Sequence, residues 1–102
     1  MEDGKFKVEK FNGQNFSFWK MQMEDYLYQK DLYLPLGRKT KMPTGMIDEE
    51  WNLLDRKALR IVRLCLAVSV AFNISKETMT EGLIKALEKL YENPQPQTRY
   101  FL

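Results

Sequence analysis

Hydrophobic residues recur at helical spacing in three separate stretches of this 102-residue sequence. The first stretch runs from Phe16 to about Gln29 and follows an extended lead-in that ends at Gly13 and Asn15. Asn15 or Ser17 is suited to cap the start of this helix. At 100° per residue, one stripe of the helix carries Phe16, Trp19, Met23, Tyr26 and Leu27. We expect this stripe to face the core.

A longer amphipathic pattern predicts a second helix from near Asp48 to about Ser69, with Glu49 and Glu50 at the positive end of the helix dipole. Its apolar face consists of Trp51, Leu54, Ala58, Ile61, Val62, Cys65 and Val68. The opposite face carries Arg56, Arg60 and Arg63. Between the two helices, residues 32–46 contain two prolines and two glycines, which predicts a loop. This loop carries the cations Arg38, Lys39 and Lys41.

The third stretch follows residues 73–78 and is predicted to begin with Ser75 or Thr78 as its cap, since Thr78 and Glu81 have capping-box spacing. Its apolar side consists of Met79, Leu83, Ala86, Leu87 and Leu90, and Asn93 with Pro94 ends it. The pattern therefore predicts an all-α domain over residues 1–93, a small bundle of three main helices with an extended N-terminal arm. Residues 94–102 are interpreted as a tail that begins a further element. The expected core anchors are Phe11, Phe16, Trp19, Trp51, Leu87 and Leu90.

Composition limits the classes of partner. Hydrophobic residues make up 44% of the chain, enough for a core, and the net charge of +2 gives only weak attraction for a polyanion. The single cysteine cannot form an internal disulfide, which favours a reducing compartment and a cytoplasmic location. No apolar run is long enough to span a bilayer, so we expect no membrane partner.

Residue types required for common catalytic sites are missing from the sequence. There is no histidine, which removes the commonest general base and metal ligand. Cys65 lies on an apolar helix face and is interpreted as a small core residue. No glycine-rich phosphate loop and no cysteine cluster with zinc spacing occurs. We therefore expect no enzymatic activity, no metal and no cofactor.

Two surfaces are candidates for binding. In the first helix, Phe18, Met21 and Tyr28 lie away from the core stripe. A helix that is apolar on both sides is either sandwiched within its domain or packed against another subunit, and the pattern leaves both alternatives open. We assign these residues to an interface, together with Tyr100 and Phe101 in the apolar end of the tail.

The second surface is basic. Arg56, Arg60 and Arg63, together with the three cations of the loop, could contact RNA phosphates. The pattern favours a solvated helix face instead, because a protein that specifically binds single-stranded nucleic acid would also have exposed aromatic residues between the charges.

Three motifs carry a resemblance to a known family. Residues 10–27, KFNGQNFSFWKMQMEDYL, resemble the start of the Gag-like polyprotein of plant copia-type LTR retrotransposons, where an aromatic, Gly, Asn, aromatic and Trp pattern opens the capsid region. The matching positions here are Phe11, Gly13, Asn15, Phe16 and Trp19. The similarity continues through residues 51–66, at Trp51, Asp55, Ala58, Ile61 and Leu64, and through residues 87–93.

This resemblance implies a structural protein without catalytic activity, whose helical capsid region self-associates into particles that enclose RNA. The family usually has a tryptophan at about the position of Ile84, further helices after the Asn-Pro and a zinc knuckle far downstream. This chain has Ile84 and no knuckle, so autonomous RNA packaging is not expected. Expected partners are a second copy or a full-length Gag-like protein, in a homo-oligomer. A naturally short copy would dock onto full-length subunits and interfere with their assembly.

Two alternatives come from other classes. A nucleic-acid module would bind RNA weakly through the basic residues, and its binding would fall steeply with salt, whereas an apolar subunit contact would hold. A domesticated host adaptor would be a monomer with a groove beside Phe18 and Met21.

Overall fold

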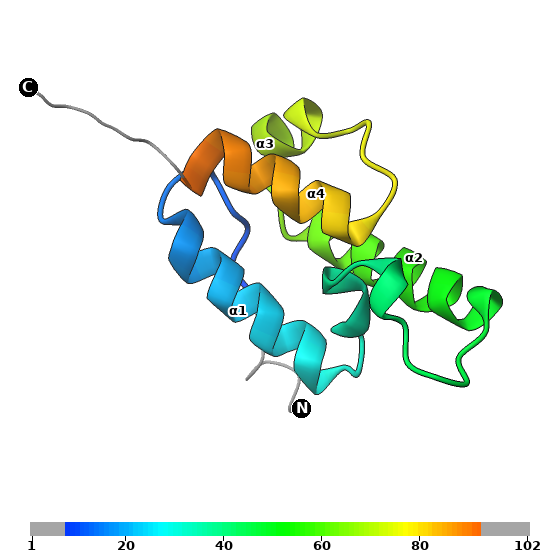
Figure 1. The fold of residues 1–102 in the computed structure, drawn as a ribbon. Coiled ribbons are helices and arrows are strands. Elements are labelled where there is room, and N and C mark those ends of the chain that lie inside the picture. Colours follow the sequence, from blue (N-terminus) through cyan, green and yellow to red (C-terminus); the bar gives the residue numbers. More distant parts are fainter. Residues whose placement is uncertain (1–7, 93–102) are drawn as a thin grey trace, which may run out of the picture.

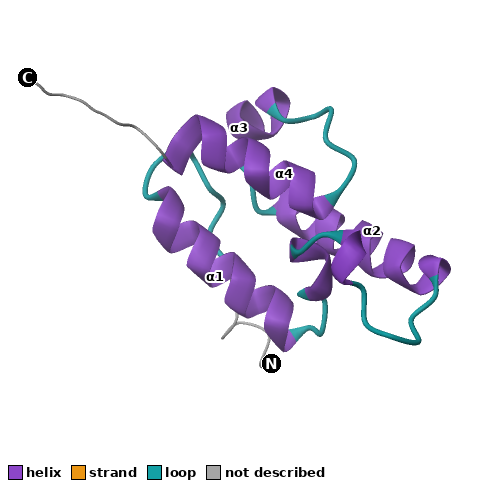
Figure 2. Ribbon diagram, in the orientation of Figure 1, coloured by secondary structure: helices purple, strands orange, loops and turns teal. Residues whose placement is uncertain are grey.

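The computed structural model describes residues 8–92, which form helices joined by loops and short turns (Figure 1). The α-helices are α1 (Phe16–Gln29), α2 (Asp48–Leu64), α3 (Val68–Asn73) and α4 (Thr80–Leu87). The π-helical turn η4 (Glu88–Glu92) continues α4, and the 3-10 turns η2 (Leu34–Leu36) and η3 (Lys39–Lys41) lie between α1 and α2. The predicted all-α bundle is confirmed, and the described residues show only helices and loops (Figure 2). The short helix α3 is an addition to the three predicted helices.

The extended lead-in is attached to the bundle by one parallel bridge between Phe11 and Leu66. The Phe11 amide donates to the Cys65 carbonyl at 2.8 Å, and the Ala67 amide donates to the Phe11 carbonyl at 2.9 Å. The prediction that the second helix continues to about Ser69 is therefore wrong. It ends at Leu64 because the next backbone groups bond to the lead-in instead of extending the helix.

This break also changes which residues reach the core. The chain restarts as α3 in a new rotational phase, so Val68 is 85% exposed although the continuous pattern placed it on the apolar face. Val70 and Ile74 are buried in its place.

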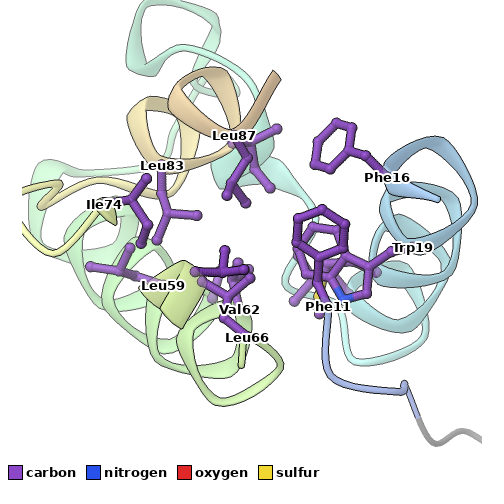
Figure 3. Close-up of a cluster of buried hydrophobic side chains, with 14 of the residues drawn as sticks. Phe11, Phe16, Trp19, Leu59, Val62, Leu66, Ile74, Leu83 and Leu87 are labelled. Atoms are coloured by element: carbon purple, nitrogen blue, oxygen red, sulfur yellow. The ribbon is translucent and has the colours of Figure 1, made fainter. Parts of the chain in front are cut away.

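The core consists of an aromatic group facing an aliphatic group (Figure 3). Phe11 lies at the centre of the aromatic group, with its ring centroid 5.4 Å from that of Phe16, 5.2 Å from Trp19 and 5.0 Å from Tyr91. The aliphatic side chains labelled in Figure 3 are Leu59, Val62, Leu66, Ile74, Leu83 and Leu87. Within the predicted stripe of α1, all positions are buried except Tyr26, which is half-buried.

Five of the six predicted core anchors are buried, with Trp51 outside the main cluster. The assignment of Leu90 to the core is wrong, because its side chain is 56% exposed. The turn η4 has i→i+5 backbone bonding, which widens the helix and shifts the rotational phase after Leu87. Tyr91 consequently packs against Phe11, and Leu90 turns to the surface.

The start of α4 also differs from its prediction. Met79, not Ser75 or Thr78, is the N-cap residue, and its side chain is exposed rather than in the core. The Thr80 amide donates to the Asp55 carboxylate at 2.9 Å, and the Thr80 hydroxyl donates to the Asp55 carbonyl at 3.0 Å. A side chain of α2 therefore performs the capping that the local sequence was expected to provide.

Residues 32–46 are more ordered than the predicted loop. Leu32 and Pro35 are buried, and η2 contacts both α2 and α4. The segment therefore closes one end of the bundle.

Candidate protein-interaction surface

One exposed face of α1 carries a row of large side chains, and we call Phe18, Met21, Asp25 and Tyr28 the α1 outer face. The exposed fractions of the three apolar members are 58% for Phe18, 49% for Met21 and 61% for Tyr28. Together with Asp25, the four members are spaced by three, four and three residues, which puts them on one side of the helix. Within the described residues no other element covers these three side chains.

An aromatic pair extends the α1 outer face at the end of the helix. The rings of Tyr28 and Tyr33 are 4.9 Å apart, and Tyr33 is exposed. Tyr33 was missed from the sequence because it lies outside the periodic stretch. The predicted interface residues Tyr100 and Phe101 lie outside the described residues.

A small pocket of about 160 Å³ lies between the lead-in and the start of α1. Phe18 and Trp19 line it, but Met21 does not, so it borders only one end of the α1 outer face. The Trp19 indole nitrogen is buried and has no hydrogen-bond partner in the described part of the chain. Its burial keeps this donor out of reach of a molecule in the pocket.

A second apolar surface lies between α3 and η4. It is a groove of about 360 Å³, and we call it the α3–η4 groove. Its lining includes two apolar side chains, Phe72, which is 80% exposed, and Leu90. It also includes the exposed lysines Lys76 and Lys89. Sequence reasoning missed this groove, because it placed Leu90 in the core and did not predict α3.

Two of the predicted basic residues in the loop are paired with carboxylates. In the loop, Arg38 lies 4.0 Å from a Glu81 oxygen and Lys39 lies 3.5 Å from an Asp48 oxygen. Lys41 is exposed on η3. These ion pairs are largely solvent-exposed and contribute little to stability.

The arginine stripe of α2 is divided. Arg56 and Arg60 are exposed, whereas the Arg63 guanidinium donates to the Glu77 carbonyl at 2.9 Å and is half-buried. Arg63 therefore holds the segment before α4 against α2. The carboxylate of Asp55, next to Arg56 in the sequence, accepts a hydrogen bond from the Thr80 amide.

Comparison with known proteins gives one extensive match. The chain is 37% identical, over 103 aligned positions that cover all of it, to the retrovirus-related Pol polyprotein from transposon TNT 1-94 of Nicotiana tabacum. It spans 8% of the length of that polyprotein. No family model and no solved structure matches the chain. Over its whole length the chain is therefore similar to one part of a copia-type retrotransposon polyprotein.

The motif resemblance to the Gag-like region of copia-type polyproteins is thereby confirmed. The structure explains what the first motif does in this chain. Phe11, Phe16 and Trp19 form the aromatic core group, while Gly13 and Asn15 have φ angles of 104° and 57° in the turn between them. Glycine and asparagine tolerate this left-handed region better than other residues. The five matching positions thus contribute to the core and the turn, and none of them belongs to the α1 outer face.

The titrating groups of this domain support packing. The Lys20 ammonium donates to a Glu88 carboxylate oxygen at 2.7 Å, and this bond raises the pKa of Lys20. The pair joins α1 to η4.

Burial raises the pKa of the Cys65 thiol, which disfavours the reactive thiolate. In residues 8–92 we find no cluster of three metal-ligating side chains, and no helix there has the length and apolarity to cross a membrane.

Proposed function

We propose that this chain is a non-catalytic protein-interaction module of a copia-type Gag-like region, which associates with a second copy or with longer Gag-like subunits. The 37% identity to part of a copia-type retrotransposon polyprotein supports the Gag-like assignment. The observation that carries the interaction role is the α1 outer face, where Phe18, Met21 and Tyr28 are exposed on the same side of one helix. An apolar row of this kind is stabilised when a partner removes it from water.

Light scattering of the purified chain over a concentration series, at low and high salt, tests this proposal. We expect a concentration-dependent oligomer that persists at high salt, because burial of apolar surface is not screened. Phe18→Asp should raise the apparent dissociation constant by about 10-fold to 100-fold, since a buried aromatic side chain contributes about 1.5 to 3 kcal/mol. A chain that stays monomeric at every concentration would overturn self-association.

The matched control is Leu53→Asp, the same kind of change at an exposed leucine on α2. Both substitutions are at the surface and should leave the free energy of unfolding within about 0.5 kcal/mol of the parent chain. An equal loss of association in both variants would show that added negative charge, and not the α1 outer face, controls the oligomer.

RNA binding is the second candidate, favoured by the exposed Arg56, Lys57 and Arg60 on α2. Phosphate contacts release counterions, so affinity for a single-stranded RNA would fall steeply as salt rises. Replacing Arg56 and Arg60 by serine would remove two phosphate contacts. The slope of log affinity against log salt concentration would then become less steep by about 1.4 to 2. A slope that does not change would exclude this face as the RNA site.

A further inference from the structure

Within residues 8–92, two apolar surfaces are exposed, the α1 outer face and the α3–η4 groove. The helices α1 and α3 lie on different sides of the segment formed by α4 and η4 (Figure 1). One molecule therefore cannot bring its own α1 outer face into its own groove.

The shapes of the two surfaces are complementary. The α1 outer face is a convex helix surface with Phe18 and Met21 three residues apart and Tyr28 two turns after Met21, beyond Asp25. The α3–η4 groove is concave, with a volume of about 360 Å³, and Phe72 and Leu90 provide its apolar walls. A helix that inserts such a row into an apolar groove is a recurring mode of protein recognition.

Their charges are complementary as well. Glu24 and Asp25 are exposed on α1, whereas Lys76 and Lys89 are exposed on the rim of the groove. Glu77 also lines the groove, but its carboxylate packs toward Gly82. Pairing α1 with α1 would place the negative charges of two copies next to each other. Pairing groove with groove would place the positively charged lysines of two copies next to each other. Only the mixed pairing matches opposite charges.

We infer that the α1 outer face of one copy docks into the α3–η4 groove of a second copy, with Glu24 and Asp25 placed toward Lys76 and Lys89. The inference rests on the proposed self-association and specifies the two surfaces that meet. The contact joins two different surfaces. If both copies of a pair exchange α1 and groove, it closes as a two-fold dimer; if each copy docks onto a different neighbour, it repeats as a ring or an open filament.

Charge reversal tests the pairing. The first variant is Glu24→Lys with Asp25→Lys, and the second is Lys76→Glu with Lys89→Glu. In each variant alone, the two docking surfaces carry the same sign of charge. We expect the apparent dissociation constant from sedimentation velocity at low salt to rise about 10-fold or more in each.

Mixing the two variants in equal amounts should restore association. The basic α1 of the first variant then meets the acidic groove of the second, and the unchanged surfaces of the pair also match. The control is Lys41→Glu with Lys57→Glu, which makes the same charge change at exposed positions on η3 and α2. This control should associate as the parent chain does.

The outcomes separate this inference from the proposed function. If the parent chain forms oligomers but the second variant alone is unaffected, the groove is not used and the inference is overturned while self-association stands. Loss of association in both variants without recovery in the mixture would also overturn it. A monomeric parent chain would overturn the proposed self-association and, with it, the inference.

Discussion

Trp19 shows how one residue contributes to the fold without contributing to a binding site. Its side chain is almost fully buried, next to Phe11 and Phe16. The neighbouring Phe18 points outward and belongs to the α1 outer face. Adjacent positions on a helix are 100° apart, so two neighbouring aromatics have different roles.

Trp19→Ala should lower the free energy of unfolding by about 3 to 5 kcal/mol, because it removes a large buried ring and leaves a cavity. That is a large part of the total stability of a domain of this size, which is about 5 to 15 kcal/mol. Urea denaturation followed by far-UV circular dichroism measures the change. Phe18→Ala is the control and should change stability by less than about 0.5 kcal/mol. Similar losses in the two variants would show that both rings are in the core.

At the scale of elements, contacts between helices determine where each helix begins and ends. The bond from Thr80 to Asp55 fixes the start of α4, and the bridge from Phe11 fixes the end of α2. The change to π-helical bonding in η4 allows Tyr91 to reach Phe11. Each of these boundaries depends on a residue that is distant in the sequence.

Asp55→Ala should cost about 0.5 to 2 kcal/mol, the usual effect of losing a capping side chain, because the Thr80 amide loses its acceptor. Asp55→Asn keeps an oxygen in the same position and should cost less than about 0.5 kcal/mol. Urea denaturation of the two variants makes the comparison. If alanine and asparagine have the same effect, the carboxylate does not act as the cap.

For the whole molecule, the lead-in unites parts of the chain that are distant in sequence. Phe11 contacts rings from α1 and η4 and bonds to the segment between α2 and α3. The lead-in is therefore part of the core rather than an appended arm.

Phe11→Ala should destabilise the whole bundle by about 3 to 5 kcal/mol and not only detach the lead-in. Native-state hydrogen exchange distinguishes the two results, because global destabilisation lowers the protection of the slowest amides in α1 and α4 together. If only the Ala67 amide, which donates to the Phe11 carbonyl, loses protection, the lead-in is a separate unit. Phe11→Leu is the control. Its loss of stability should be less than half of the loss caused by Phe11→Ala, since leucine keeps most of the buried volume.

The sequence by itself determined the all-α class, the core stripe of α1 and the outward position of Phe18, Met21 and Tyr28. These properties follow from hydrophobic periodicity, which is local and can be read from consecutive residues. The three motifs also indicated the family, because their order and spacing are properties of the sequence alone.

Only the tertiary structure decided the end of α2, the existence of α3 and the exposure of Leu90. Local periodicity favoured one continuous helix through Val68, but the backbone of residues 65–67 is stabilised by bonds to Phe11, more than fifty positions earlier. The α3–η4 groove results from that break and from the π-helical turn. Its partnership with α1 is therefore a hypothesis that only the folded chain could suggest.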